Sequence, residues 1–137
     1  GRTAMRTLLL LAAGSLLAAA PAAQAGPRDD AETRIARAVE GRVAGEPVDC
    51  ISLNRVHSSR VIDDEAIIFD AGSTIYVNRP RAGRDALDER NTLISRPSAS
   101  RLCSIDVMQV YDPALRTRTG VVFLGEFIPY RRVPSSR

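Results

Sequence analysis

The stretch CISLNRVHSSRVIDDEAIIFDAGSTIYVN, residues 50–78, decides the fold class that this chain is expected to adopt. Within it, residues 66–70 (AIIFD) and 73–78 (STIYVN) are two β-prone runs separated by Ala71 and Gly72. Glycine accepts the positive φ angle of a tight turn, so a short break with Gly between such runs indicates a β-hairpin. The sequence therefore predicts two antiparallel strands joined by a tight turn.

The side-chain pattern of this stretch predicts how its strands lie in a sheet. In the second run Ile75 and Val77 share one face, opposite Tyr76, which suits a sheet with one buried and one partly wet face. The first run is apolar on both faces, so we expect it at the centre of the sheet. A further strand is expected over residues 58–62. It should end at a turn in residues 63–64 (Asp-Asp), because Asp side chains bond their own backbone in turns.

Residues 1–25 have the pattern of a secretory signal peptide. Met5 and Arg6 begin a short basic segment, a Leu/Ala run follows, and residues 23–25 (AQA) match the A-x-A cleavage pattern. The apolar run is about a dozen residues long, short of the about 20 that a membrane-spanning helix needs. We therefore expect cleavage after Ala25, a periplasmic or secreted protein, and no transmembrane segment after cleavage.

Composition and charge fit one small domain without the marks of a nucleic-acid-binding protein. The chain has 137 residues, with 19 basic and 16 acidic side chains and a net charge of +3. Because Arg2 and Arg6 belong to the predicted signal peptide, the remaining chain is nearly neutral, and we expect no nucleic-acid partner. With three Phe, three Tyr and no Trp, an aromatic stacking platform is not expected either.

The chain has two cysteines, Cys50 and Cys103. In an exported protein, an even pair of cysteines predicts one disulfide. Closing a loop of about 50 residues would stabilise the fold by about 4 kcal/mol in the chain-entropy treatment. A catalytic or metal-binding role is the alternative, and the absence of Cys-x-x-Cys spacing and of further histidines argues against it.

Residues 29–40 (DDAETRIARAVE) predict the one helix of the chain. Asp29 and Glu32 approximate a capping box at its start, and Gly41 is a natural stop. Its narrow apolar stripe consists of Ile35, Ala38 and Val39. A helix with so few large apolar residues is expected to lie at the periphery, against the sheet.

The rest of the chain predicts further short strands joined by polar links. The strands are expected at residues 92–94, 102–111 and 121–130. Gly125 inside the last of them suggests a bulge or a close approach of another backbone segment. Residues 79–90 (RPRAGRDALDER) mix both signs of charge, so we expect a solvated loop with one helical turn near Ala86 and Leu87.

These patterns together predict a mainly β fold. We expect a small antiparallel curled sheet, or a partly closed barrel, of about six strands with one peripheral N-terminal helix. Hairpin-sized links favour antiparallel pairing, because parallel strands need long crossovers. The expected organisation is a helix and connector in residues 26–47, one β-rich domain in residues 48–132 and a polar tail in residues 133–137.

His57, the only histidine, is the starting point for any catalytic hypothesis. Neighbours on a strand point to opposite faces, so His57 and Ser58 cannot easily cooperate. His57 and Ser59 share a face, but no nucleophile elbow or oxyanion-hole signature accompanies them. We predict no catalytic residue and no cofactor.

Four acidic residues, Asp63, Asp64, Glu65 and Asp70, lie close together in the sequence and suggest oxygen ligands for Ca²⁺. Their spacing matches no EF-hand pattern, and turn formation is a sufficient role for the Asp pair. We therefore predict no metal site. The candidate surface site of this region comprises His57, Arg60, Asp63 and Asp64.

Five short segments, taken together with their order and spacing along the chain, form a pattern that is specific enough to compare with known families. They are Cys-Ile-x-Leu at 50–53, Arg-Val-Ile-Asp-Asp at 60–64, Ile-Tyr-Val-Asn at 75–78, Leu-Cys at 102–103 and Leu-Gly-Glu-Phe-Ile-Pro-Tyr-Arg at 124–131. In these segments the chain resembles a small exported bacterial family of unknown function. Many relatives have further cysteines after the segment at 75–78; residues 79–90 have none here, so a second disulfide or a metal site is not carried over. The resemblance implies an envelope location and no particular activity.

The sequence favours a non-enzymatic exported domain that binds an envelope component or another protein. One alternative is an inhibitor of an envelope-directed hydrolase, which needs a protruding loop; residues 79–90 are the candidate. The other alternative is an enzyme of unfamiliar type, which needs acidic residues that converge on a pocket around His57.

Overall fold

The computed structural model of the chain describes residues 12–18, 26–95 and 100–134. Most of the predicted signal peptide lies outside these ranges and stays a prediction. Residues 12–18 are exposed and have no regular secondary structure. Among the described residues, no helix has the length and apolar character needed to cross a membrane.

The described residues form one α-helix, two short 3₁₀ helices and ten antiparallel strands. In chain order they are α1 (Pro27–Ala38), β1 (Arg42–Ala44), β2 (Cys50–Ser52), η1 (Leu53–Arg55), β3 (Ser58–Ile62), β4 (Ala66–Asp70), β5 (Thr74–Asn78), η2 (Arg84–Ala86), β6 (Thr92–Ile94), β7 (Arg101–Cys103), β8 (Val107–Asp112), β9 (Thr117–Phe123) and β10 (Phe127–Arg132). The prediction of a mainly β chain with one helix is confirmed. The expected count of about six strands is wrong.

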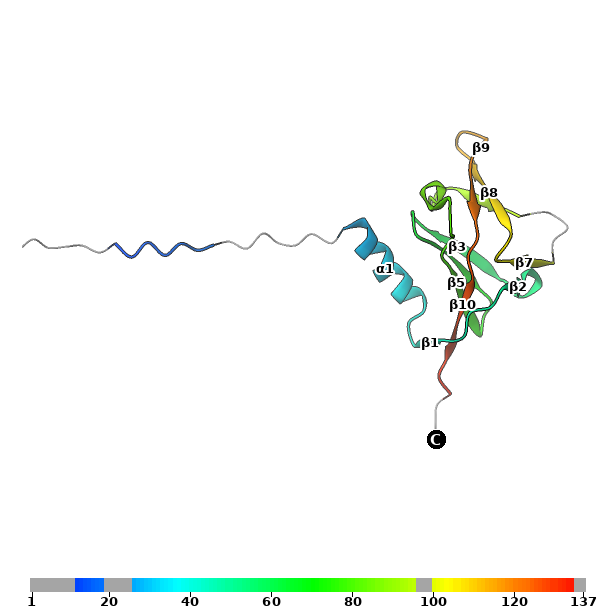
Figure 1. Cartoon of the computed structure of the whole chain (residues 1–137), viewed down its shortest axis with the longest axis horizontal. Helices are drawn as coiled ribbons and strands as arrows, with labels where there is room; N and C mark the ends of the chain where they lie inside the picture. Colours follow the sequence, from blue (N-terminus) through cyan, green and yellow to red (C-terminus); the bar gives the residue numbers. More distant parts are fainter. Residues whose placement is uncertain (1–11, 19–25, 96–99, 135–137) are drawn as a thin grey trace, which may run out of the picture.

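The strands form layers and no barrel. The central sheet has the order β1-β10-β5-β4-β3, and smaller sheets are formed by β6-β8-β9 and by β2-β7. α1 lies on one face of the central sheet, and the small sheets lie on the other face (Figure 1). None of these sheets of described residues closes on itself.

The hairpin predicted around Ala71 and Gly72 is present as β4 and β5. Gly72 has a φ angle of 80°, the left-handed conformation that favoured glycine there. Residues 66–69 of β4 are buried on both faces, as expected for a central strand. β3 pairs with β4 through a turn in which Asp64 has a φ angle of 57°.

Other layers pack on both faces of the central sheet at the β4–β5 hairpin, and Tyr76 is only partly buried, as expected for the less buried face. Ile75 and Val77 belong to a core on the α1 face, whereas Tyr76 packs against a second core on the opposite face. In the second core the rings of Phe69 and Phe127 lie 5.7 Å apart. Burying both faces produces one continuous packed body of helix, sheet and sheet.

α1 begins two residues earlier than expected. Gly26 is its N-cap, and the carboxylate of Asp29, in the first turn, accepts the Gly26 N–H at 3.3 Å. A cap formed by Asp29 with Glu32 is therefore wrong. Proline at the first helical position extends the helix, because its fixed φ suits that position and its missing N–H would have no partner there. The helix buries Ala31 and Ile35 against the central sheet, and Val39, which follows the last helical residue, belongs to the same core.

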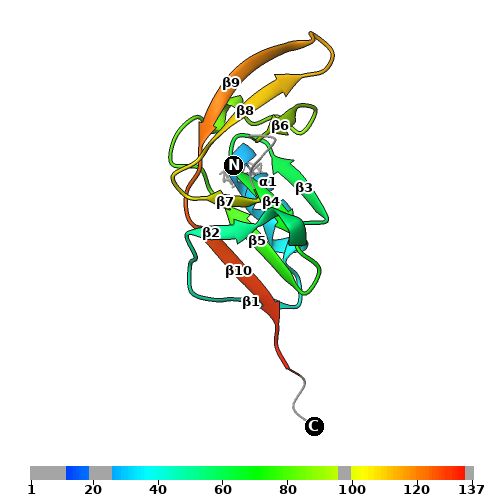
Figure 2. The same cartoon turned by 90° about the vertical axis from the view of Figure 1, so that its right-hand side faces the viewer.

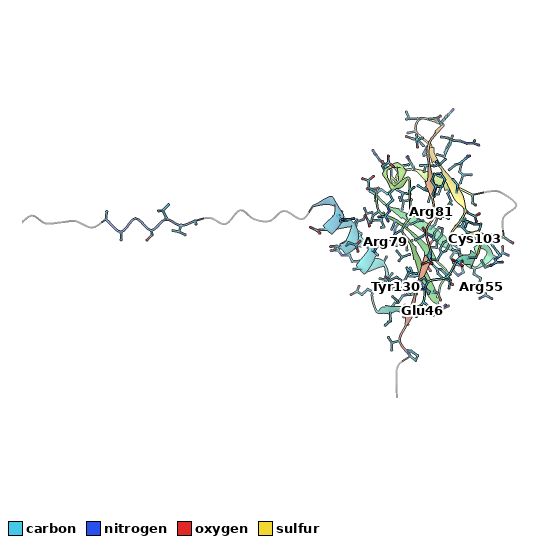
Figure 3. The ribbon with its side chains drawn as sticks, viewed as in Figure 1. Glu46, Arg55, Arg79, Arg81, Cys103 and Tyr130 are labelled. Atoms are coloured by element: carbon cyan, nitrogen blue, oxygen red, sulfur yellow. A yellow bond between two sulfur atoms is a disulfide. The ribbon has the colours of Figure 1, made fainter. Side chains whose placement is uncertain are left out.

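The predicted disulfide between Cys50 and Cys103 is confirmed. The two residues are direct partners in the β2–β7 pair, and their Cα atoms are 4.0 Å apart. Ile51 and Leu102, which follow and precede them, are buried in the second core. The disulfide thus holds two three-residue strands over this core, on the side of the central sheet away from α1 (Figure 3).

Residues 102–111, expected as one strand, are divided between two sheets. β7 ends at Cys103 because the Asp106 carboxylate accepts the Cys103 N–H at 2.7 Å, and the Asp106 N–H donates to the Cys103 carbonyl at 2.9 Å. These two bonds close a turn of the kind that Asp favours. β8 begins at Val107 and pairs with β6 and β9 instead.

Residues 121–130 are also divided, into β9 and β10, and Gly125 lies at the break. A Cβ atom on Gly125 would collide with the carbonyl oxygen of Arg79, so the predicted close backbone approach is confirmed. The Asn78 side chain, fully buried, donates to the Gly125 carbonyl at 2.7 Å and accepts the Gly125 N–H at 3.0 Å. Asn78 thereby replaces the backbone partners that Gly125 would have inside a strand.

Replacing Asn78 should therefore destabilise the fold. We expect Asn78→Ala to lower the free energy of unfolding by about 2–3 kcal/mol, because a cavity replaces the buried amide and the partly buried N–H and C=O groups of Gly125 lose their partner. Urea denaturation measures this change. The matched control is Asn54→Ala in η1, where the side chain is exposed and the expected change is within about 0.5 kcal/mol. Equal effects of the two substitutions would contradict this role of Asn78.

Candidate binding groove

The residues of the predicted surface site are spread along the edge strand β3. His57 precedes β3, Arg60 is its central residue, and Asp63 and Asp64 follow its end. The extended chain from residue 57 to residue 63 spans about 20 Å. Arg60 and the Asp pair line hollows beside α1, so the structure brings these three to one side of the molecule. His57 stays apart from them.

The carboxylates that could orient the His57 imidazole in an enzyme form hydrogen bonds with backbone N–H groups instead. His57 is exposed, and its Nε2 lies beside Gly72. The Asp70 carboxylate accepts the Gly72 N–H at 2.8 Å, and the Asp63 carboxylate accepts the Glu89 N–H at 2.7 Å. Among the described residues, no hydrogen bond or ion pair joins the His57 imidazole to either of these carboxylates.

A groove runs between α1 and β3. It consists of adjoining hollows of about 430, 260 and 380 Å³. Arg34 lines the first and second hollows, and Ala38 and Arg60 line the second and third, so the hollows adjoin one another. The first lies at the β3–β4 turn and the third at Ser58, the first residue of β3. We call this feature the α1–β3 groove.

Positive charge gathers in the middle of the α1–β3 groove. Arg34 and Arg37 of α1 and Arg60 of β3 line its second hollow. Arg34 lies 2.6 Å from Glu89 and 3.8 Å from Asp63. Arg37 and Arg60 are exposed and take part in none of the ion pairs among the described residues. Their charges are therefore available to an anion that enters the groove.

The β3–β4 end of the groove is acidic, and its most buried carboxylate is already paired. The Glu65 side chain is 12% exposed and lies 3.2 Å from Arg79 and 3.5 Å from Arg84. Arg79 also contacts Glu32 of α1 at 2.9 Å, on the helix side of the central sheet (Figure 3). Asp64 lines the first hollow. Within the described ranges no three His, Cys, Asp or Glu side chains are grouped to hold a metal ion.

The loop of residues 79–90, the candidate for an inhibitory contact, is packed against the body of the protein. The expected helical turn is present as η2, and Leu87 is buried. Gly83 lies so close to the Val121 carbonyl that a Cβ atom would collide with it. Hydrogen bonds from Arg90 lower the pKa of Asp88 to about 2, so these two charges satisfy each other within the loop. The element that protrudes is the β8–β9 hairpin (Figure 2).

A second surface feature is the outer face of the β6-β8-β9 sheet. Cross-strand pairing places Val107 opposite Phe123, and Gln109 opposite both Val121 and Ile94, on one face. The four apolar members are partly exposed: Ile94, Val107, Val121 and Phe123. This face is largely apolar, and none of these paired residues is charged. The face therefore does not indicate what kind of ligand it could bind.

Arg60 was part of the predicted site, whereas Arg34 and Arg37 were not. Arg34 and Arg37 are three residues apart, so they lie on one side of a helix. This spacing is the feature of the sequence that could have predicted their common position. That side faces β3 only because the neighbouring apolar stripe of α1 packs on the central sheet. The groove therefore depends on tertiary packing.

No protein-family model matches this chain, and neither does any curated protein or solved structure. The resemblance to a small exported bacterial family stays a prediction. Functional inference consequently depends on the geometry and charge of the groove.

Proposed function

We propose that this chain is an exported, non-enzymatic binding domain of the cell envelope and that the α1–β3 groove holds an anionic ligand. Export is supported by the signal-peptide pattern of residues 1–25 and by the Cys50–Cys103 disulfide, because disulfides persist in oxidising compartments. The observation that carries the ligand assignment is that Arg37 and Arg60 line one hollow and take part in none of the ion pairs found in the described part of the chain.

The position of these two arginines distinguishes them from other exposed cations. Arg118 and Arg132 lie exposed on β9 and β10 and line none of the three hollows of the groove. Arg37 of α1 and Arg60 of β3 line the same hollow from two different elements. A guanidinium group binds carboxylates and phosphates through two parallel hydrogen bonds. Two such groups across a groove can therefore hold an anion from both sides.

The test is affinity capture from an envelope extract with the immobilised protein and with the double variant Arg37→Gln/Arg60→Gln. Glutamine removes the charge and keeps a side chain of similar polarity and good helix propensity. We expect the wild-type protein to retain an anionic component that is eluted by salt, because charged contacts are screened. The variant should lose at least about nine-tenths of it, the equivalent of about 1.4 kcal/mol.

The matched control is Arg118→Gln/Arg132→Gln, which changes the net charge equally outside the groove. It should retain the component as the wild type does. Circular dichroism checks that all three proteins are folded to the same extent. Equal retention by the groove variant, or equal loss by the control, would refute the assignment of the groove.

A further inference from the structure

β3 has an open edge beside the α1–β3 groove. It is the last strand of the central sheet, and β4 is its one partner among the described strands. In an antiparallel pair, alternate residues direct their N–H and C=O groups away from the partner strand. An edge strand of this kind can take up another extended chain through main-chain hydrogen bonds.

One row of β3 side chains would accompany a chain added at this edge. Ser58, Arg60 and Ile62 alternate along the strand and share its α1 face, where they line the hollows of the groove. The row is small and polar at one end, cationic in the middle and apolar at the other end. At about 3.3 Å per residue, the five residues of β3 match a ligand segment of about five residues.

We infer that the ligand of the groove is an extended acidic peptide segment that adds to β3 as a sixth strand of the central sheet. This inference rests on the proposed anion-binding function and names the class of its ligand. A Glu or Asp side chain of the segment lies opposite Arg60 and within reach of Arg37 across the hollow. Its neighbours two residues away lie opposite Ser58, which is exposed, and Ile62, which is buried in the core under α1.

A second copy of this chain is a poorer occupant of the same edge. Arg60 is the central residue of β3, so antiparallel pairing of two β3 strands centred on it would place two guanidinium groups opposite each other. Like charges directly opposite across two strands are destabilising. A complementary carboxylate at that position reverses the sign of the interaction, and for this reason we assign the edge to an acidic segment of another protein.

The experiment is a nuclear magnetic resonance titration of the purified protein with short blocked peptides. The probes are acetyl-Thr-Thr-Glu-Thr-Val-amide and its reverse sequence, acetyl-Val-Thr-Glu-Thr-Thr-amide, which cover parallel and antiparallel addition. We expect one of them to shift the backbone amide signals of β3 and to slow their hydrogen exchange at millimolar concentration. Replacing its Glu with Gln, or using Arg60→Gln protein, should weaken binding about fivefold or more.

N-methylation separates strand addition from charge attraction. Two versions of the binding peptide carry a methyl group on the amide nitrogen of Glu or of the Thr that follows it. Because only alternate N–H groups of an added strand point to its partner, one version should bind about tenfold more weakly and the other should bind normally.

The possible results separate strand addition from the anionic groove. Normal binding of both methylated peptides would overturn strand addition and leave the anionic groove standing. Equal binding of the Glu and Gln peptides would refute the anionic groove and the acidic ligand together. Strand addition also fails if neither peptide shifts the β3 signals. Self-association through β3 in the absence of peptide, seen by sedimentation and concentration-dependent β3 shifts, would assign the edge to a second copy and overturn the inference.

Discussion

Replacing both Cys50 and Cys103 with serine should lower the free energy of unfolding by about 4 kcal/mol. Their separation of 53 residues sets the chain-entropy contribution that the disulfide removes from the unfolded state. A domain of this size has a total stability of about 5–15 kcal/mol, so the expected loss is a large share of it. The folded state is affected as well, because the disulfide clamps the β2–β7 pair over Ile51 and Leu102.

Urea denaturation with and without dithiothreitol measures this effect. The reductant should destabilise the wild-type protein by the same amount as the two serine substitutions, and it should not change the stability of the double variant. A loss of less than about 1 kcal/mol would show that the β2–β7 pair holds without its covalent link. Free thiols in protein isolated from its host would contradict the predicted export, because oxidising compartments preserve such pairs.

Phe127→Ala should cost about 3–5 kcal/mol, since it removes an aromatic side chain from a closed core. Phe127 is fully buried at the start of β10, and its ring lies 5.7 Å from that of Phe69. The residue also joins segments that are distant in sequence: it pairs with Asn78 of β5 and bridges to Val48. A cavity at this position would loosen the contact between the central sheet and the layer above it.

Phe123→Ala is the matched control for this prediction. Phe123 ends β9 on the outer face of the small sheet and is 38% exposed, so its truncation should cost less than about 1 kcal/mol. Urea denaturation of the two variants, both with the disulfide intact, compares their free energies of unfolding. Similar losses for the two substitutions would mean that the core does not depend on Phe127 as described.

Local sequence patterns predicted the elements that depend on neighbouring residues. The β4–β5 hairpin follows from two β-prone runs and a glycine that accepts positive φ, and β3 follows from the run before the Asp63-Asp64 turn. α1 was predicted from its apolar spacing, although its first residue was missed. The disulfide followed from the count of cysteines and the signal-peptide pattern.

Elements that depend on distant partners were predicted less well. Residues 42–44 have no strand pattern of their own and become β1 by pairing with β10. The expected strand over residues 121–130 is interrupted because Asn78 and the Arg79 carbonyl meet Gly125 from another part of the chain. The strand count and the barrel alternative were wrong for the same reason.

The candidate site shows the same division. Arg60 was predicted as a surface residue of interest, and its position on β3 is local. Arg34 and Arg37 join it because the apolar stripe of α1 packs on the sheet next to the β3 edge. His57, predicted with Arg60, lies outside the groove because it precedes β3 and its ring lies beside Gly72.

The amino-acid sequence by itself determined that this protein is mainly β, has one helix and contains the Cys50–Cys103 pair, because backbone preferences and the number of thiols are properties of short segments and of composition. Tertiary structure alone decided the division into layers, the packing of one core on each face of the central sheet and the groove that Arg37 and Arg60 line. The physical reason is that each of these features arises from contacts between segments far apart in the chain, whose relative positions are set by the packing of two cores on either side of one sheet.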